Sequence, residues 1–371
     1  MLFLSSILKR VVYPSLARVG YLRRSRARQI SIITYHGVFP KGYPVVGPNL
    51  GPNLGPNFDP ILDGTLLTVE MFRRQLRKLR STYNIFSPSE FRDWLSTGRE
   101  LPERTALLTC DDGLLNHLTG MVPVLLEENL SCLFFVTGAS VADPYSILWY
   151  VELSLMLARS TRRELELLLD GKRIKIPLID PLAKRIAWLQ LVQQLSTVDG
   201  NSRKNLLSEM RENLGLQPGW NSIYLEDPVL RDRFCVMGVP ELQRVLESGM
   251  EVGAHTVTHP IPSRQPADVL LAEMVASREL LGKALGSPVW AFAYPFGDDD
   301  SVSPREIEIA EHAGFECAFR NTGGPLRSRV RPQALPRIHV SYDMNLGEFE
   351  AHVSGFHEAL RNRFRGKARS I

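Results

Sequence analysis

Cysteine is scarce in this sequence, and its few copies are far apart. Only four of the 371 residues are cysteine, and no two of them form a C-x-x-C pair. All four lie in or beside apolar runs, so we expect buried, reduced thiols, which favours a cytoplasmic location. They are Cys110, Cys132, Cys235 and Cys317.

Long apolar runs are also missing. No stretch reaches the roughly 20 apolar residues that a membrane-spanning helix needs. The apolar start, residues 2–8, has no basic residue before it and ends at Lys9 and Arg10, so it does not match a secretory signal. Apolar residues make up 44% and charged residues 23% of the chain. These values exclude a disordered chain, a collagen-like repeat and a multi-span membrane protein.

Acidic residues are absent from both ends of the chain. Residues 1–30 carry seven basic groups and residues 361–371 carry five, with no acidic residue in either segment. Because the whole chain has a net charge of +4, residues 31–360 carry a net charge of −8. An acidic body argues against a nucleic-acid enzyme. The basic ends suit contact with an anionic surface.

Residues 1–28 form a basic amphipathic segment. Apolar residues recur at steps of three and four from Leu4 to Val19, as on one face of a helix that Pro14 would kink. Either this helix packs on the body, or it lies on anionic lipid at the inner face of the membrane. At the other end, we expect residues 346–371 to form a basic tail.

Between these ends, residues 29–345 alternate between strand and helix patterns. A buried strand at 105–110, a helix at 114–129 and a strand at 132–137 make a βαβ unit, which implies a parallel sheet. The repeated order favours a (β/α) barrel or a doubly wound sheet. Further strands are expected near residues 30–34, 250–254, 289–294 and 315–319.

Residues at about 143–235 interrupt this order. They contain three helical patterns, and a hairpin signal at Asp170-Gly171 between two strand patterns. We therefore expect a helical insertion within the α/β domain. The helical patterns cover residues 148–160, 181–197 and 202–214.

Polar residues gather where predicted strands end, which in parallel α/β folds is the face on which sites are built. Two imidazoles four residues apart, together with a carboxylate, can hold a divalent ion such as zinc. The histidine pair lacks the neighbouring Glu of a helical metalloprotease motif, which excludes that class. The polar segments are Tyr35-His36, Asp111-Asp112-Gly113, His255-Thr256-Val257-Thr258-His259 and Tyr294-Pro295-Phe296-Gly297.

These segments resemble four ordered motifs of one family. Residues 109–113 (T-C-D-D-G) are similar to the T-F-D-D-G motif of the polysaccharide deacetylases (NodB-homology domain, carbohydrate-esterase type), and residues 255–259 match its H-[ST]-x-x-H motif. Residues 292–297 are similar to its third motif in the form F-A-Y-P-Y-G, and Tyr35-His36 matches the Y-H that opens many members. The resemblance, over roughly residues 30–340, implies a distorted (β/α)7 barrel and metal-dependent removal of N- or O-acetyl groups from a polysaccharide.

The resemblance also implies roles for individual residues. It implies that Asp112, His255 and His259 are ligands of a divalent metal ion, with Zn²⁺ expected, and that Asp111 is the catalytic base. Residues of the first and third segments are expected to bind substrate. These substrate-binding candidates are Tyr35, His36, Tyr294, Pro295 and Phe296.

Two positions depart from the family pattern. Cys110 replaces the usual Phe, and Ala293 stands where many members have an Arg that orients the catalytic Asp. We expect Arg337 to pair with Asp111 instead, and His339 to protonate the leaving amine. The alternatives are a surface Arg and an ordinary strand histidine. The histidines expected on helix surfaces are His117, His312, His352 and His357.

Three functions remain open. The first is a hydrolase that removes acetyl groups from a polysaccharide or a lipid-linked sugar, most readily by cleaving the C–N bond of N-acetyl groups. The second is an amidohydrolase of a small non-sugar amide. The third is a non-catalytic carbohydrate-binding protein, which the intact acids and histidines argue against.

The expected partners are therefore an acetylated carbohydrate and an anionic membrane, and no nucleic acid. We expect the insertion to cap the catalytic face, so that its removal spares metal binding and changes the range of substrates. Candidate aromatic residues for sugar stacking are Trp149, Tyr150, Trp220, Tyr224 and Trp290.

Overall fold

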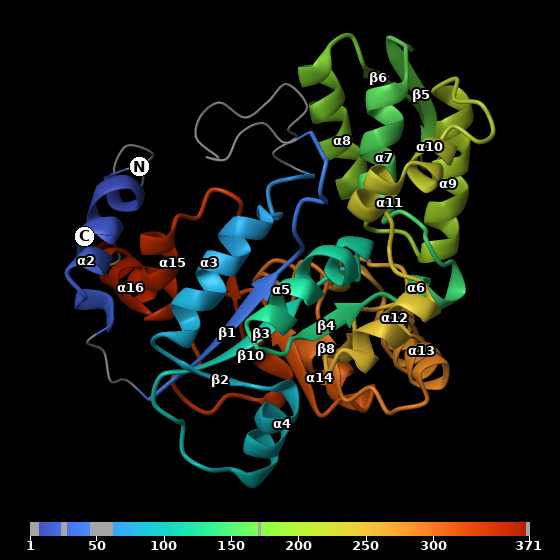
Figure 1. Cartoon of the computed structure of the whole chain (residues 1–371). Coiled ribbons are helices and arrows are strands. Elements are labelled where there is room, and N and C mark those ends of the chain that lie inside the picture. Colours follow the sequence, from blue (N-terminus) through green and yellow to red (C-terminus); the bar gives the residue numbers. More distant parts are fainter. Residues whose placement is uncertain (1–6, 24–27, 45–61, 170–171, 369–371) are drawn as a thin grey trace.

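The computed structural model describes residues 7–23, 28–44, 62–169 and 172–368, and its centre is a barrel of parallel strands (Figure 1). The order of the strands around the barrel follows their order in the chain. Every neighbouring pair is parallel. The first six positions are β1 (Ile30–Tyr35), β3 (Thr105–Cys110), β4 (Leu133–Val136), β7 (Glu251–Ala254), β8 (Ala291–Ala293) and β9 (Cys317–Arg320).

Two very short strands share the seventh position. β10 (Leu335–Pro336) pairs with β9, and β11 (Ile338–His339) pairs with β1. The two strands close the barrel between β9 and β1, and Arg337 is the residue between them. One further strand, β2 (Asn84–Phe86), pairs with β3 outside the ring. The prediction of a distorted (β/α)7 barrel with a helical insertion is confirmed.

The sequences of β1 and β3 explain why these neighbouring strands lie inside the barrel. All residues of β1 (I-S-I-I-T-Y) and β3 (T-A-L-L-T-C) are buried, as expected for strands covered by side chains on both faces. The register pairs Ile30 with Thr105 and Tyr35 with Cys110, so both strands end at the same level. The residues that follow them, His36 and Asp111, are therefore brought side by side.

Helices cover the outside of the barrel. In α3 the Oγ1 of Thr68 accepts a hydrogen bond from the Met71 amide at 3.1 Å and caps the helix, whose Phe72 and Leu76 are buried. The helix expected at 114–129 begins instead with a π-helical turn at His117–Met121, followed by α5. The covering helices are α3 (Val69–Arg80), α4 (Pro88–Thr97), α5 (Val122–Glu127), α12 (Val239–Glu247), α13 (Ala267–Leu285) and α14 (Pro304–His312).

The insertion between β4 and β7 has an apolar core of its own, which includes Leu153, Met156, Leu191 and Met210. In Figure 1 it stands at the top, beyond one end of the barrel. An antiparallel hairpin accompanies its helices, and the hairpin turn at residues 170–171 lies outside the described residues. After the short α6 (Ala139–Ala142), its elements are α7 (Trp149–Arg159), β5 (Glu164–Leu169), β6 (Lys172–Pro177), α8 (Pro181–Leu195), α9 (Gly200–Asn213), α10 (Ser222–Glu226) and α11 (Pro228–Phe234).

The two ends of the chain pack on each other (Figure 1). A π-helical turn at Leu8–Val12 and α2 (Tyr13–Arg18) lie against α15 (Leu346–Val353) and α16 (Phe356–Ala368). The expected C-terminal tail is thus helical over 346–368, whereas residues 1–6, 24–27 and 369–371 lie outside the described residues. None of the described helices is both long and apolar enough to cross a membrane.

Candidate active site

The turn after β3 places two carboxylates at the end of the barrel. The Asp111 amide donates to the Tyr35 carbonyl at 2.9 Å, which keeps the chain in the sheet up to that residue. Asp112 then has a φ of +83° and Gly113 a φ of +74°. A Cβ on Gly113 would lie 2.9 Å from Cγ1 of Val136, so only glycine fits this turn without displacing β4.

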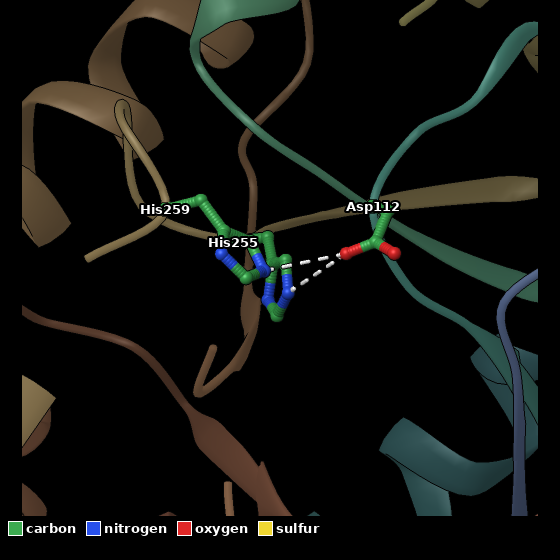
Figure 2. A group of neighbouring side chains, drawn as sticks. All are labelled: Asp112, His255 and His259. Carbon is green, nitrogen blue, oxygen red and sulfur yellow. Dashed lines mark ion pairs between the residues drawn. The ribbon is translucent and has the colours of Figure 1, made fainter. Parts of the chain in front are cut away.

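Asp112 faces the two histidines that follow β7 (Figure 2). Its Oδ1 lies 3.3 Å from Nε2 of His259 and 3.7 Å from Nε2 of His255. One potential ligand atom from each of the three residues lies within 4.8 Å of the others. The Nδ1 of His255 lies 2.7 Å from the Ala293 carbonyl, which can only accept. This contact places the proton on Nδ1 and leaves the Nε2 lone pair directed at the cluster.

The protonation states in this cluster suit a metal ion. Burial lowers the pKa of His259, which keeps the imidazole neutral and its lone pair available. Burial would raise the pKa of Asp112, but the His255 and His259 rings outweigh this and hold the pKa well below its usual range. Two imidazoles and one carboxylate are a donor set that fits zinc and several other divalent ions.

Asp111 is held by a different partner, Arg337. The guanidinium donates to both carboxylate oxygens, from Nη1 to Oδ1 at 2.6 Å and from Nη2 to Oδ2 at 2.5 Å. Arg337 is fully buried and stacks over the rings of Phe135 and Phe319. Burial acts to raise the pKa of Asp111, but Arg337 more than offsets this and holds the pKa below its usual value. Arg337 thus makes the contact with Asp111 that the alanine at position 293 cannot make.

His339 lies beside His36, because the β1–β11 register pairs Thr34 with His339. The two rings are 4.9 Å apart, edge to face. Burial, reinforced by the neighbouring His36, lowers the pKa of His339 to about 3, so the imidazole is neutral at pH 7. Both rings lie at the same cavity as the two aspartates.

That cavity has a volume of about 430 Å³ and is lined by the two aspartates, by His255 and His259, and by His36 and His339, whereas Arg337 does not line it. Of the five substrate-binding candidates, His36 and Phe296 line it. The other three do not: Tyr35 is buried against Phe72, Tyr294 donates from its hydroxyl to the Gln333 carbonyl, and Pro295 is buried beside it. These three residues pack behind the site and do not line it.

The insertion supplies further cavity residues. Of the five aromatic stacking candidates, Tyr150 is the one that lines the cavity, with its ring 5.2 Å from that of His259 and 6.1 Å from that of Phe296. Arg233, which pairs with the buried Asp63 at 2.6 Å, also lines it. Arg233 could not be predicted from the sequence, because it lies in no motif and its partner Asp63 is 170 residues away.

Residues with a strained backbone also gather at this cavity. Seven non-glycine residues of the described chain have a positive φ, and four of them line or flank the cavity: Asp112, Thr256, His259 and Phe296. Each such residue costs on the order of 1–3 kcal/mol, and this cost is tolerated where the surroundings fix the conformation for a function.

The structure thus combines a (β/α) barrel with a buried Asp-His-His cluster beside a second carboxylate, which Arg337 holds. A family model described as polysaccharide deacetylase matches residues 229–318, which contain the histidine pair and the third motif. The predicted resemblance to the polysaccharide deacetylases is thereby confirmed. Residues 229–318 of the chain are therefore similar to the polysaccharide deacetylases.

Solved structures show the same fold. The deacetylase PplD from Streptococcus pyogenes, solved in complex with acetate, is 16% identical with a TM-score of 0.52, over 88% of this chain and 98% of that one. IcaB from Ammonifex degensii is 17% identical with a TM-score of 0.50, over 89% of this chain and 98% of that one. The search of curated proteins found no match.

Proposed function

We propose that the protein is a metal-dependent deacetylase that hydrolyses the amide bond of N-acetyl groups on a polysaccharide or a lipid-linked sugar. One observation carries this proposal. The buried Asp112-His255-His259 cluster lies directly beside Asp111, whose carboxylate accepts two hydrogen bonds from Arg337. This arrangement supports a metal site and a separate base at one cavity.

The three residues of the cluster would hold the ion. A divalent ion bound there would supply a Lewis acid that polarises the acetyl carbonyl and favours deprotonation of the attacking water. In this proposal Asp111 accepts the proton of that water. Because Arg337 keeps Asp111 ionised and fixes its orientation, the carboxylate is ready to act as a base at neutral pH.

His339 is proposed as the acid that protonates the leaving amine. Its ring lies at the cavity beside His36 and is neutral in the free protein. The proton that Asp111 takes from the attacking water would pass to His339 and then to the nitrogen of the leaving amine, and an imidazole with so low a pKa would release it readily.

The substrate is proposed from the class of relatives and from the cavity walls. The similar solved structures include a deacetylase in complex with acetate, and the aromatic rings of Tyr150 and Phe296 give this cavity an apolar wall suited to a sugar face. The other aromatic candidates stand away from the cavity. This second observation favours a compact substrate and keeps a small non-sugar amide as the alternative.

Acetate release by the metal-loaded protein tests the proposal. N-acetylated oligosaccharides and small acetamides should be offered in parallel, with and without a chelator, and His255→Ala should serve as the inactive control. We expect release from the sugars that stops with chelator and returns with added metal. Release from the small amides alone would favour the alternative, and sugar binding without any release would favour a carbohydrate-binding protein.

We further propose that the N-terminal segment contacts an anionic membrane at its cytoplasmic face. One side of the segment is occupied, since Tyr13 packs against α15 and α16. The other side combines the exposed Arg10 and Arg18 with apolar side chains that are 38–66% exposed. Cations beside exposed apolar groups suit an anionic lipid surface. The exposed apolar residues are Ile7, Val11, Val19 and Tyr21.

Flotation with liposomes tests this second proposal. We expect binding to anionic vesicles that high salt weakens and that Val11→Asp with Val19→Asp abolishes. Leu126→Asp, which changes an equally exposed apolar residue on α5, should leave binding intact. Equal flotation of all variants would contradict the proposal.

A further inference from the structure

The loop that carries both histidines, residues 255–259 (the histidine loop), has a strained backbone. Thr256 and His259 have φ values of +59° and +53°. His259 is the last residue of the loop, and its ring must turn back towards Asp112. A conformation of this kind persists only where surrounding groups fix it.

The barrel fixes the middle of the histidine loop. The Glu273 carboxylate on α13 accepts hydrogen bonds from the amides of Val257 and Thr258, at 2.8 and 2.9 Å, and from the Thr258 hydroxyl at 2.6 Å. The Thr256 hydroxyl accepts from the His259 amide at 3.1 Å. Among the described residues, no barrel group donates a hydrogen bond to the carbonyls of Thr258 and His259, which form the end of the loop.

Two side chains of the insertion donate hydrogen bonds to these two carbonyls. Nε1 of Trp149, at the start of α7, donates to the His259 carbonyl at 2.9 Å. Nη2 of Arg203, on α9, donates to the Thr258 carbonyl at 3.2 Å and to its hydroxyl at 2.8 Å. The guanidinium of Arg203 lies 4.8 Å from the Trp149 ring centroid, and both side chains are buried. The two donors therefore support each other as well as the loop.

A close approach of α9 completes this contact. A Cβ on Gly200 would lie 2.8 Å from Cγ2 of Thr258. Since the φ of Gly200 is not positive, the missing side chain is explained by proximity to the loop and not by backbone conformation.

We propose that Trp149 and Arg203 are positioning residues that hold His259 in its metal-binding orientation, so that the insertion sets the metal affinity of the barrel. The inference rests on the proposed function, because it takes the Asp112-His255-His259 cluster as the metal site. It replaces the expectation that removing the insertion would spare metal binding.

Metal affinity of the full-length protein tests this inference. Zn²⁺ is titrated into the metal-free protein against a competing chelator, and unfolding of the metal-free protein is measured separately. Trp149→Phe removes the donor to His259 but keeps the ring under Arg203. We expect about 10–100-fold weaker Zn²⁺ binding, the usual effect of losing a group that orients a ligand.

Trp188→Phe is the matched control. Nε1 of Trp188 donates to the Tyr150 carbonyl at 2.7 Å, so the same substitution removes the same kind of bond within the insertion. We expect this variant to bind Zn²⁺ like the wild type. If both variants weakened Zn²⁺ binding equally, or if Trp149→Phe left it unchanged, the inference would be overturned.

Gly200→Ala provides a second variant if Trp149→Phe does not fold. Alanine favours the helix but presses on Thr258, so we expect weaker Zn²⁺ binding with no loss of stability in the metal-free protein. Unchanged affinity here would also count against the inference. Wild-type protein that binds no Zn²⁺ would overturn the proposed function as well, whereas equal binding by wild type and variants would overturn the positioning role alone.

Discussion

The barrel and the insertion contribute to the active site in different ways. In the barrel, the strands position the reactive groups. Asp111, His255 and His339 stand at or directly after the ends of β3, β7 and β11. The insertion reaches the site through Tyr150 in the cavity wall and through Trp149 behind His259. In our proposal the barrel supplies the catalytic groups, while the insertion adjusts ligand orientation and the shape of the cavity.

The largest effect is expected from a ligand in the barrel. His255→Ala removes one imidazole and the contact to the Ala293 carbonyl. We expect acetate release to fall by more than the roughly 10²–10⁴-fold that loss of a general base costs. Zn²⁺ content by mass spectrometry should fall in parallel. A variant that kept full activity would end the deacetylase proposal.

Arg337→Met should affect both stability and pH dependence. It leaves the buried Asp111 charge without its partner, which we expect to cost about 3–5 kcal/mol in the free energy of unfolding. The pKa of Asp111 is held low by Arg337, so its removal raises that pKa. Because the base acts only when ionised, the acid limb of the rate profile should move to higher pH. An unmoved acid limb would contradict the assignment of Asp111 as the base.

Tyr150→Ala should change substrate affinity more than the chemical step. Its ring lies at the cavity next to His259, and among the described residues no hydrogen bond joins it to Asp111. We expect KM for the best sugar substrate to rise by about tenfold, since stacking on an aromatic ring contributes roughly 0.5–1.5 kcal/mol. The kcat value should change less. A selective loss of kcat with KM unchanged would place Tyr150 in the chemistry instead.

The smallest effect concerns the contribution of histidines to pH-dependent stability, which originates outside the insertion because residues 143–235 contain no histidine. His117 was expected at the surface but is buried, with Nε2 at 3.2 Å from the His36 carbonyl. Burial lowers its pKa to about 4. Between about pH 6.5 and 4 the unfolded chain therefore binds a proton that the folded protein does not.

Stability should consequently fall as the pH is lowered through this window, by up to about 1.4 kcal/mol per pH unit for this histidine. Urea unfolding of the metal-free protein at pH 7, 6 and 5 measures the slope, and His117→Gln should make it shallower. An identical slope in the variant would show that His117 does not contribute.

The strands of the barrel could be predicted because their patterns are continuous. β1 and β3 are apolar and buried along their whole length, and polar motifs follow directly. β10 and β11 could not be predicted, because each has two residues and Pro336 interrupts the strand pattern. The C-terminal helices were missed because the basic residues of the last eleven positions dominate that end of the sequence.

Within the site, the resemblance to the polysaccharide deacetylases predicted the cluster of Asp112 and the two histidines but not the residues that support it. The pairing of Arg337 with Asp111 could be expected only from the missing Arg at Ala293. The bond from Trp149 to His259 joins residues 110 positions apart and depends on how the insertion packs. No local pattern carries that information.

The separate roles of the two adjacent aspartates form the central claim, and one paired measurement tests them most directly. Asp111→Asn and Asp112→Asn are compared for Zn²⁺ content and acetate release in the same preparation. We predict that Asp111→Asn keeps its metal and loses about 10²–10⁴-fold in rate, whereas Asp112→Asn loses metal and activity together. Loss of metal in Asp111→Asn with retention in Asp112→Asn would contradict the account.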